Sequence, residues 1–167
     1  RIIENYVDEH KKAIAQIANK LSLVGPTDYD ESLSKTHALY PGFLTMLIAN
    51  RDAALVTSSP RSLMDNLPKS GFTISDRSYF VQAFYHQSLY TSPVFLGRGF
   101  GSDPIIAISA PIYAKNSTTP IGIVEGSLNL NMFDQVNRYA VNDRQVEVVL
   151  TDENDNVIYA ESGLALT

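Results

Sequence analysis

The chain has 167 residues, no cysteine and a net charge of −5 at pH 7. An acidic chain with dispersed charges repels the phosphate backbone, which disfavours a nucleic-acid-binding role. The absence of cysteine excludes disulfides, iron–sulfur clusters and thiolate zinc sites. No run approaches the ~20 apolar residues that span a bilayer, and the length fits one domain with its own core.

The first 23 residues are predicted to form one long helix, because apolar positions recur at alternating steps of four and three. Gly25 and Pro26 then end it. This stripe fits a helix that packs on its own sheet or one that also pairs with a second copy, and both interpretations stay open. The stripe consists of Ile3, Val7, His10, Ile14, Ile17 and Leu21, and a second apolar edge of Ile2, Tyr6 and Ala13.

The rest of the chain reads as short strands separated by turn residues and short helices. In chain order we predict helix 30–39 capped by Asp30, strands 43–49 and 53–57, a helical turn at 63–67, helix 76–87 capped by Ser75 or Asp76, strands 94–96, 105–113 and 121–130, a helix near 132–139, and strands 146–151 and 157–160. Consecutive hairpins indicate an antiparallel sheet, so the predicted class is α+β.

Four segments together resemble the Cache domains, the PAS-like extracytoplasmic sensors. The run Ser75–Phe80 resembles their D-R-x-[WY]-[FY] signature. The short strand Ser92–Phe95, the S-x-P-[VI]-Y strand Ile106–Tyr113 and the G-x-[LV]-x-G-x-[IL]-x-L strand Ile121–Leu130 follow in the family's order. The agreement covers about residues 43–133.

The resemblance implies a long N-terminal helix (1–27) on one face of a five-stranded antiparallel PAS-like sheet (28–140), with a ligand on the other face. Residues 141–167 would close the sheet as a hairpin or begin a second Cache module. Such domains are extracytoplasmic parts of histidine kinases, diguanylate cyclases or chemoreceptors, so we expect a periplasmic domain of an inner-membrane protein. We expect no cofactor, and no enzyme signature is present.

Arg77 is the first candidate for a ligand contact, because a guanidinium forms a planar fork that matches a carboxylate. Its alternative role is a structural pair with Asp76 or Glu125. Tyr79 would wall the pocket or pack in the core. Side chains alternate along a strand, so Glu125 and Ser127 would face the pocket while Gly126 would let the long helix approach.

The resemblance also bears on the ligand. Cache domains that bind amino acids carry Asp at the position of Ser127 and Tyr near Val94, and neither is present here. A small carboxylate without an amine therefore fits better. Glu125 could replace the missing acid, although exposure at a sheet edge is the expectation. Phe95 and a loop residue, Arg98, complete the predicted site.

Two functions remain open at this point. The first is a small-molecule sensor that forms a homodimer through the N-terminal helix. The second is a protein-interaction or dimerisation module whose pocket is plugged by Phe95 or Phe100. No metal is expected, because His10, His37 and His86 lack metal-ligand spacing and Asp152–Gly163 lacks the glycine and final acid of a calcium loop.

Overall fold

A computed structural model describes residues 2–68, 70–96, 104–131, 149–151 and 157–160. The chain divides into two compact units. The first comprises residues 1–91 and 107–128, and the second comprises residues 92–106 and 129–167. No helix among the described residues is long and apolar enough to cross a membrane.

The first unit is built on an antiparallel sheet of strands in the order β2-β1-β6-β5-β3. Its strands are β1 (Phe43–Asn50), β2 (Leu55–Ser59), β3 (Tyr90–Thr91), β5 (Pro104–Tyr113) and β6 (Pro120–Asn129). β6 is the central strand, and both of its faces are buried. The predicted α+β fold with a five-stranded antiparallel sheet is confirmed.

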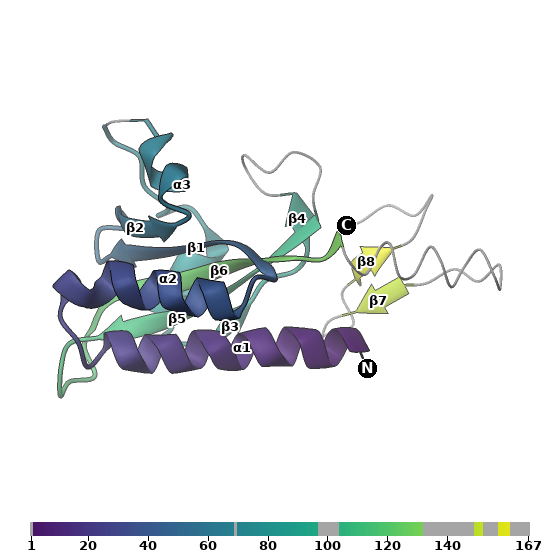
Figure 1. Ribbon diagram of the computed structural model, residues 1–167, viewed down its shortest axis with the longest axis horizontal. Helices are drawn as coiled ribbons and strands as arrows, with labels where there is room; N and C mark the ends of the chain where they lie inside the picture. The colour runs from purple at the N-terminus through teal and green to yellow at the C-terminus, as the bar shows by residue number, and fades with distance from the viewer. Residues whose placement is uncertain (1, 69, 97–103, 132–148, 152–156, 161–167) are drawn as a thin grey trace. The chain divides into compact units, whose positions relative to one another are not determined.

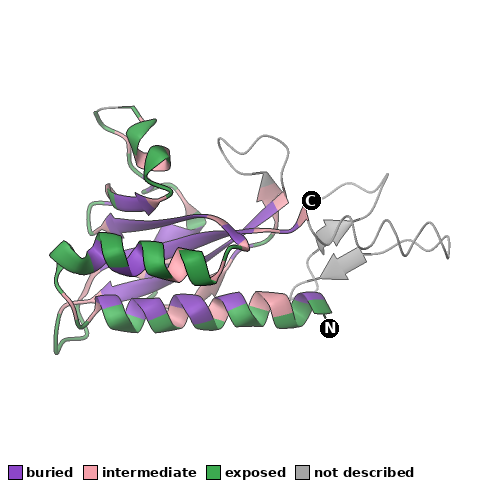
Figure 2. Cartoon of the chain, in the orientation of Figure 1, coloured by how far each residue is buried: buried purple, intermediate pink, exposed green. Residues whose placement is uncertain are grey.

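Two helices, α1 (Ile2–Leu21) and α2 (Tyr29–Leu39), lie on the same side of this sheet (Figure 1). The side of α1 that carries the predicted stripe is buried and its other side is exposed (Figure 2). The His10 ring meets the Phe43 ring of β1 edge-on at 4.9 Å, and Ser22 Oγ accepts the N–H of Tyr113 at the end of β5. The stripe therefore packs on its own sheet.

α2 is attached to the edge of the sheet through His37. Nε2 lies 2.7 Å from the carbonyl oxygen of Phe43 and Nδ1 lies 2.7 Å from Ser59 Oγ. A carbonyl only accepts, so Nε2 carries a proton and Nδ1 can accept from the hydroxyl of Ser59. This histidine joins α2 to β1 and β2, which is a structural role.

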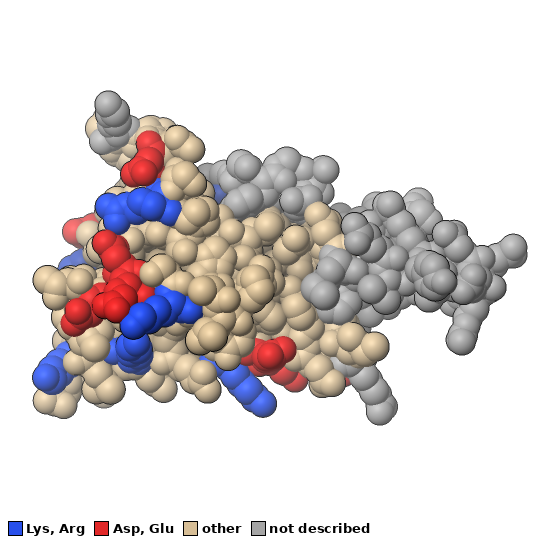
Figure 3. Space-filling view, viewed as in Figure 1, with Lys and Arg blue, Asp and Glu red and all other residues tan. Residues whose placement is uncertain are grey.

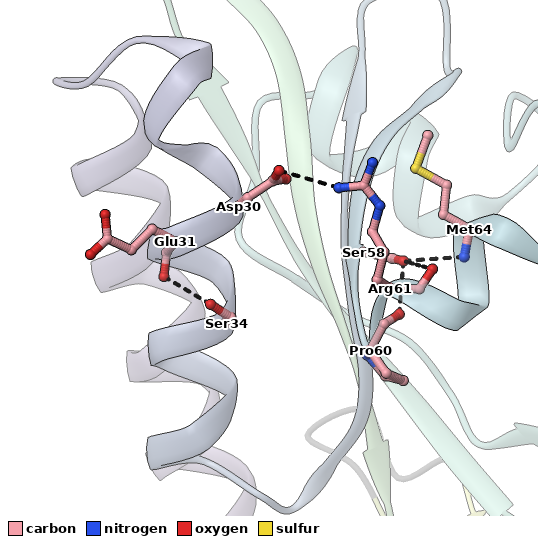
Figure 4. A network of polar contacts seen from close by, with 7 residues as sticks. All are labelled: Asp30, Glu31, Ser34, Ser58, Pro60, Arg61 and Met64. Carbon is pink, nitrogen blue, oxygen red and sulfur yellow. Dashed lines mark hydrogen bonds and ion pairs between the residues drawn. The ribbon is translucent and has the colours of Figure 1, made fainter.

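Helix α3 (Arg61–Asp65) follows β2 and is held to it by Ser58, whose hydroxyl donates to Pro60 O at 2.9 Å and accepts from the N–H of Met64 (Figure 4). Arg61 reaches Asp30 on α2 at 3.2 Å. In Figure 3, acidic and basic side chains intersperse over α2, as expected from this pair and the neighbouring Lys35–Glu31 pair. This face carries no field of a single sign.

Helix α4 (Ser78–Phe84) is shorter than predicted. Arg77 precedes it with an extended backbone, φ −81° and ψ 134°, so the prediction that Ser75 or Asp76 caps the helix is wrong. At the other end Gln87 has φ 51°, a left-handed conformation that α-helices do not continue. Strand β3 was missed, because two residues are too few for a periodic pattern.

The second unit contains β4 (Phe95–Leu96), which pairs antiparallel with Pro104 and Ile105, the beginning of β5, which belongs to the same unit. It also contains the hairpin of β7 (Val149–Thr151) and β8 (Val157–Ala160), where strands were predicted. The helix predicted near 132–139 and the turn at 152–156 lie outside the described residues.

Candidate functional site

The two faces of the central strand differ in chemistry. A Cβ added to Gly126 would lie 2.5 Å from the Phe43 ring, which contacts α1 through His10, so Gly126 faces α1. Because successive side chains point to opposite faces, Glu125 and Ser127 face away from α1. The predicted division of this strand is thus as the sequence indicated, but the close neighbour at Gly126 is the Phe43 ring of β1 and not the long helix itself.

The face away from α1 gathers buried polar side chains from neighbouring strands. In-register partners share a face, so Thr45 on β1 lies with its partner Ser127, and Leu47 lies with Glu125. On β5, Ser109 Oγ donates to the carbonyl oxygen of Tyr79 in α4 at 2.8 Å. Arg77, which directly precedes α4, acts electrostatically on Glu125.

Glu125 is the centre of this polar group. Its side chain is 1% exposed, and Ser127 Oγ donates to its carboxyl group at 2.9 Å from Oε2 and 3.4 Å from Oε1. The expectation that Glu125 is exposed at a sheet edge is wrong, because β6 is the central strand and lies between β1 and β5.

Burial determines the protonation of this acid. Desolvation raises the pKa of Glu125 to about 8, while the hydrogen bond from Ser127 and the positive charge of Arg77 act in the opposite direction without compensating. At pH 7 Glu125 is therefore mainly a neutral carboxylic acid, able to donate a hydrogen bond as well as to accept one.

Arg77 is half-buried and, among the described residues, forms no ion pair within 4 Å. It therefore acts on Glu125 from beyond contact distance, and the predicted structural pair with Asp76 or Glu125 is absent among the ion pairs of the described residues. The prediction that Arg77 lies in the first turn of a helix is wrong, because Arg77 directly precedes α4. Its carbonyl oxygen accepts the N–H groups of Phe80 and Val81 in the first turn. Tyr79 is buried, which fits either role considered for it.

The other predicted site residues belong to the second unit. Val94 and Phe95 are partly exposed, with Phe95 on β4, and Arg98 lies outside the described residues. Their contribution to a site stays a prediction. Thr45 was not predicted as part of the polar face, although its strand position shares the parity of Ser127 once the register is known.

No family model matches the sequence, and no curated protein matches it. Among solved structures, the chain is similar to the ligand-binding domain of the Pseudomonas aeruginosa amino acid chemoreceptor PctC in complex with GABA, with a TM-score of 0.74 and 17% identity over 98% of this chain and 71% of that chain. It is also similar to the ligand-binding domain of the Pseudomonas fluorescens chemoreceptor CtaA in complex with L-leucine, with a TM-score of 0.69 and 17% identity over 93% of this chain and 62% of that chain.

A third similar structure is an extracellular ligand binding receptor from Desulfohalobium retbaense, with a TM-score of 0.76 and 14% identity over 96% of this chain and 29% of that chain. The chain thus spans less than two thirds of the length of two of these three proteins. At such identities the likeness is one of fold. The chemoreceptor domains are sensor domains of the Cache type, so the Cache fold predicted from the sequence is confirmed.

Proposed function

We propose that this chain is the extracytoplasmic sensing domain of a membrane receptor, and that it binds a small carboxylate on the sheet face away from α1. The observation that carries the proposal is the buried group of Glu125 and Ser127 with Arg77 nearby, on a fold shared with ligand-binding domains of chemoreceptors. The positive charge of Arg77 and the acid O–H of neutral Glu125 suit an anionic oxygen ligand.

The neighbours are ligand-binding and sensory domains, which supports a non-enzymatic role for this domain. In this proposal the output domain is a histidine kinase, a diguanylate cyclase or a chemoreceptor signalling domain beyond the membrane. A ligand changes the output only when it binds two arrangements of the receptor with different affinity.

A homodimer through α1 is part of the proposal. Most of the heptad stripe is buried on the chain's own sheet, which leaves the exposed Ile2 and the half-buried Val7 for a second copy. The dimer would therefore form at the beginning of α1. Sedimentation velocity should show a dimer that Ile2→Glu dissociates, whereas a monomer at all concentrations would refute this part.

A thermal-shift screen tests the ligand proposal. The panel contains propionate, lactate, succinate and benzoate, with propylamine and γ-aminobutyrate for comparison. A ligand at about 100 times its Kd stabilises the folded state by about 2.7 kcal/mol, which is about 5 to 11 °C in Tm for a domain of this size. We expect a saturable shift with at least one carboxylate.

Two variants locate the site. Arg77→Ala should abolish the shift while leaving the unliganded Tm nearly unchanged, because a half-buried arginine without an ion pair contributes little to stability. Arg61→Ala is the control, since it removes an exposed arginine that pairs with Asp30 on α2, and it should keep the shift. A shift that survives Arg77→Ala would refute the assignment, and a flat panel would favour the protein-interaction alternative.

A further inference from the structure

Glu125 is a buried acid with very little to stabilise a negative charge. Among the residues that the structure describes, Ser127 is its one hydrogen-bond partner and no lysine or arginine nitrogen lies within 4 Å. An ionised carboxylate has about four acceptor positions. One hydroxyl donor leaves most of them unsatisfied, which is costly for a buried charge.

The neutral acid avoids this cost. It carries one O–H donor, and its remaining oxygen lone pairs need fewer partners. Because Ser127 Oγ donates to the carboxyl group, the acid's own O–H has no acceptor among the hydrogen bonds of the described residues, and it can be offered to a ligand.

We infer that Glu125 contributes to binding as a neutral carboxylic acid, which donates its O–H to a ligand carboxylate held by the charge of Arg77, so that binding requires the protonated acid and weakens as pH rises. This inference rests on the proposed function and adds that pH regulates ligand binding at that site through the protonation of Glu125. Two carboxylates in contact cannot both stay ionised without a large repulsion, so a carboxylate ligand selects the protonated form of Glu125.

The surroundings leave Glu125 as the group that titrates. The segment before α4 contributes the permanently charged Arg77, and α4 itself contributes Tyr79 as its one ionisable residue. Strand β1 carries no ionisable side chain, and β5 carries only Tyr113 at its end. Within the described residues of these segments there is no histidine, and the one other acid is Asp76, which directly precedes Arg77.

The sign and size of the effect follow from selection of the protonated form. Burial raises the pKa of Glu125 to about 8. The carboxyl group of Glu125 is therefore protonated in about nine-tenths of the molecules at pH 7 and in about one-tenth at pH 9. Apparent affinity scales with the competent fraction. The Kd of a carboxylate should therefore rise about tenfold between these pH values. An ammonium ligand would behave oppositely, because it would stabilise ionised Glu125.

Titration calorimetry of propionate, lactate, succinate and benzoate at pH 6, 7, 8 and 9 tests the inference. The wild type should show the tenfold loss, and so should the control Glu31→Gln, which removes an exposed acid. Glu125→Gln should bind at every pH with one Kd, because its amide N–H replaces the O–H donor. Binding without pH dependence in the wild type would overturn the inference and leave the proposed function standing. A rise in affinity with pH would also overturn it and would point to ionised Glu125. No carboxylate binding at any pH would overturn both.

Discussion

Replacing Glu125 by glutamine should stabilise the protein near neutral pH. The unfolded chain releases the Glu125 proton near pH 4.5, whereas the folded protein keeps it until about pH 8. Between these values the folded state holds one more proton than the unfolded state, so the free energy of unfolding falls as pH rises. Glutamine has nearly the same shape and cannot ionise, so this loss disappears in the variant.

The magnitude follows from the two pKa values. Each pH unit in this window lowers the free energy of unfolding by about 1.4 kcal/mol, which amounts to about 3 kcal/mol at pH 7. Between pH 5 and pH 7 the wild type should lose about 2 to 3 kcal/mol relative to Glu125→Gln. Below about pH 4.5, Glu125 is protonated in both the folded and the unfolded state, so its ionisation no longer lowers the free energy of unfolding.

Urea unfolding followed by circular dichroism at pH 5, 6 and 7 measures this difference. The pH slope carries the test, because an imperfect fit of the amide would shift every pH value equally. Glu31→Gln is the control: the hydrogen bond and charge of Lys35 lower the pKa of the exposed Glu31, so its linkage lies below this window. A wild type that gains stability from pH 5 to pH 7 relative to Glu125→Gln would show that Glu125 is ionised and paired, and would refute the reasoning.

Two further predictions concern the packing that positions the site. Ile14→Ala should cost about 2 to 5 kcal/mol, because this α1 side chain is 0% exposed, while Ile2→Ala, which removes a side chain that is 78% exposed, should change stability by less than about 0.5 kcal/mol. Equal costs in urea unfolding would contradict the burial of the α1 stripe on its own sheet. Gly126→Ala should cost about 1 to 3 kcal/mol, because its Cβ would lie 2.5 Å from the Phe43 ring. Phe43→Leu should rescue part of that loss, and additive costs in the double variant would argue against the contact.

The sheet face on which each strand residue lies could be predicted from the sequence because it depends on local alternation. Along strand 121–130 the two-residue period divides the side chains between two faces, and Gly126 lies on the face that packs toward the first helix. The stripe of the first helix likewise identifies its buried side. These patterns need no knowledge of distant residues.

The state of Glu125 could not be predicted in this way. A lone glutamate in a strand normally lies in water, and only the strand order β2-β1-β6-β5-β3 places it in the middle of the sheet. The beginning of α4 was misplaced for a related reason, since Ser75 and Asp76 are good capping residues locally, but the chain stays extended through Arg77. Both errors come from tertiary context that the sequence pattern does not contain.

An NMR titration of backbone amides with the carboxylates of the panel tests the central claim most directly. Binding on the face away from α1 predicts that the largest shift changes fall on Arg77, Glu125, Ser127 and Thr45, that they saturate together, and that Arg77→Ala removes them. Changes concentrated on the exposed sides of α1 and α2, or none with any carboxylate, would contradict a small-molecule sensor that binds its ligand at this face.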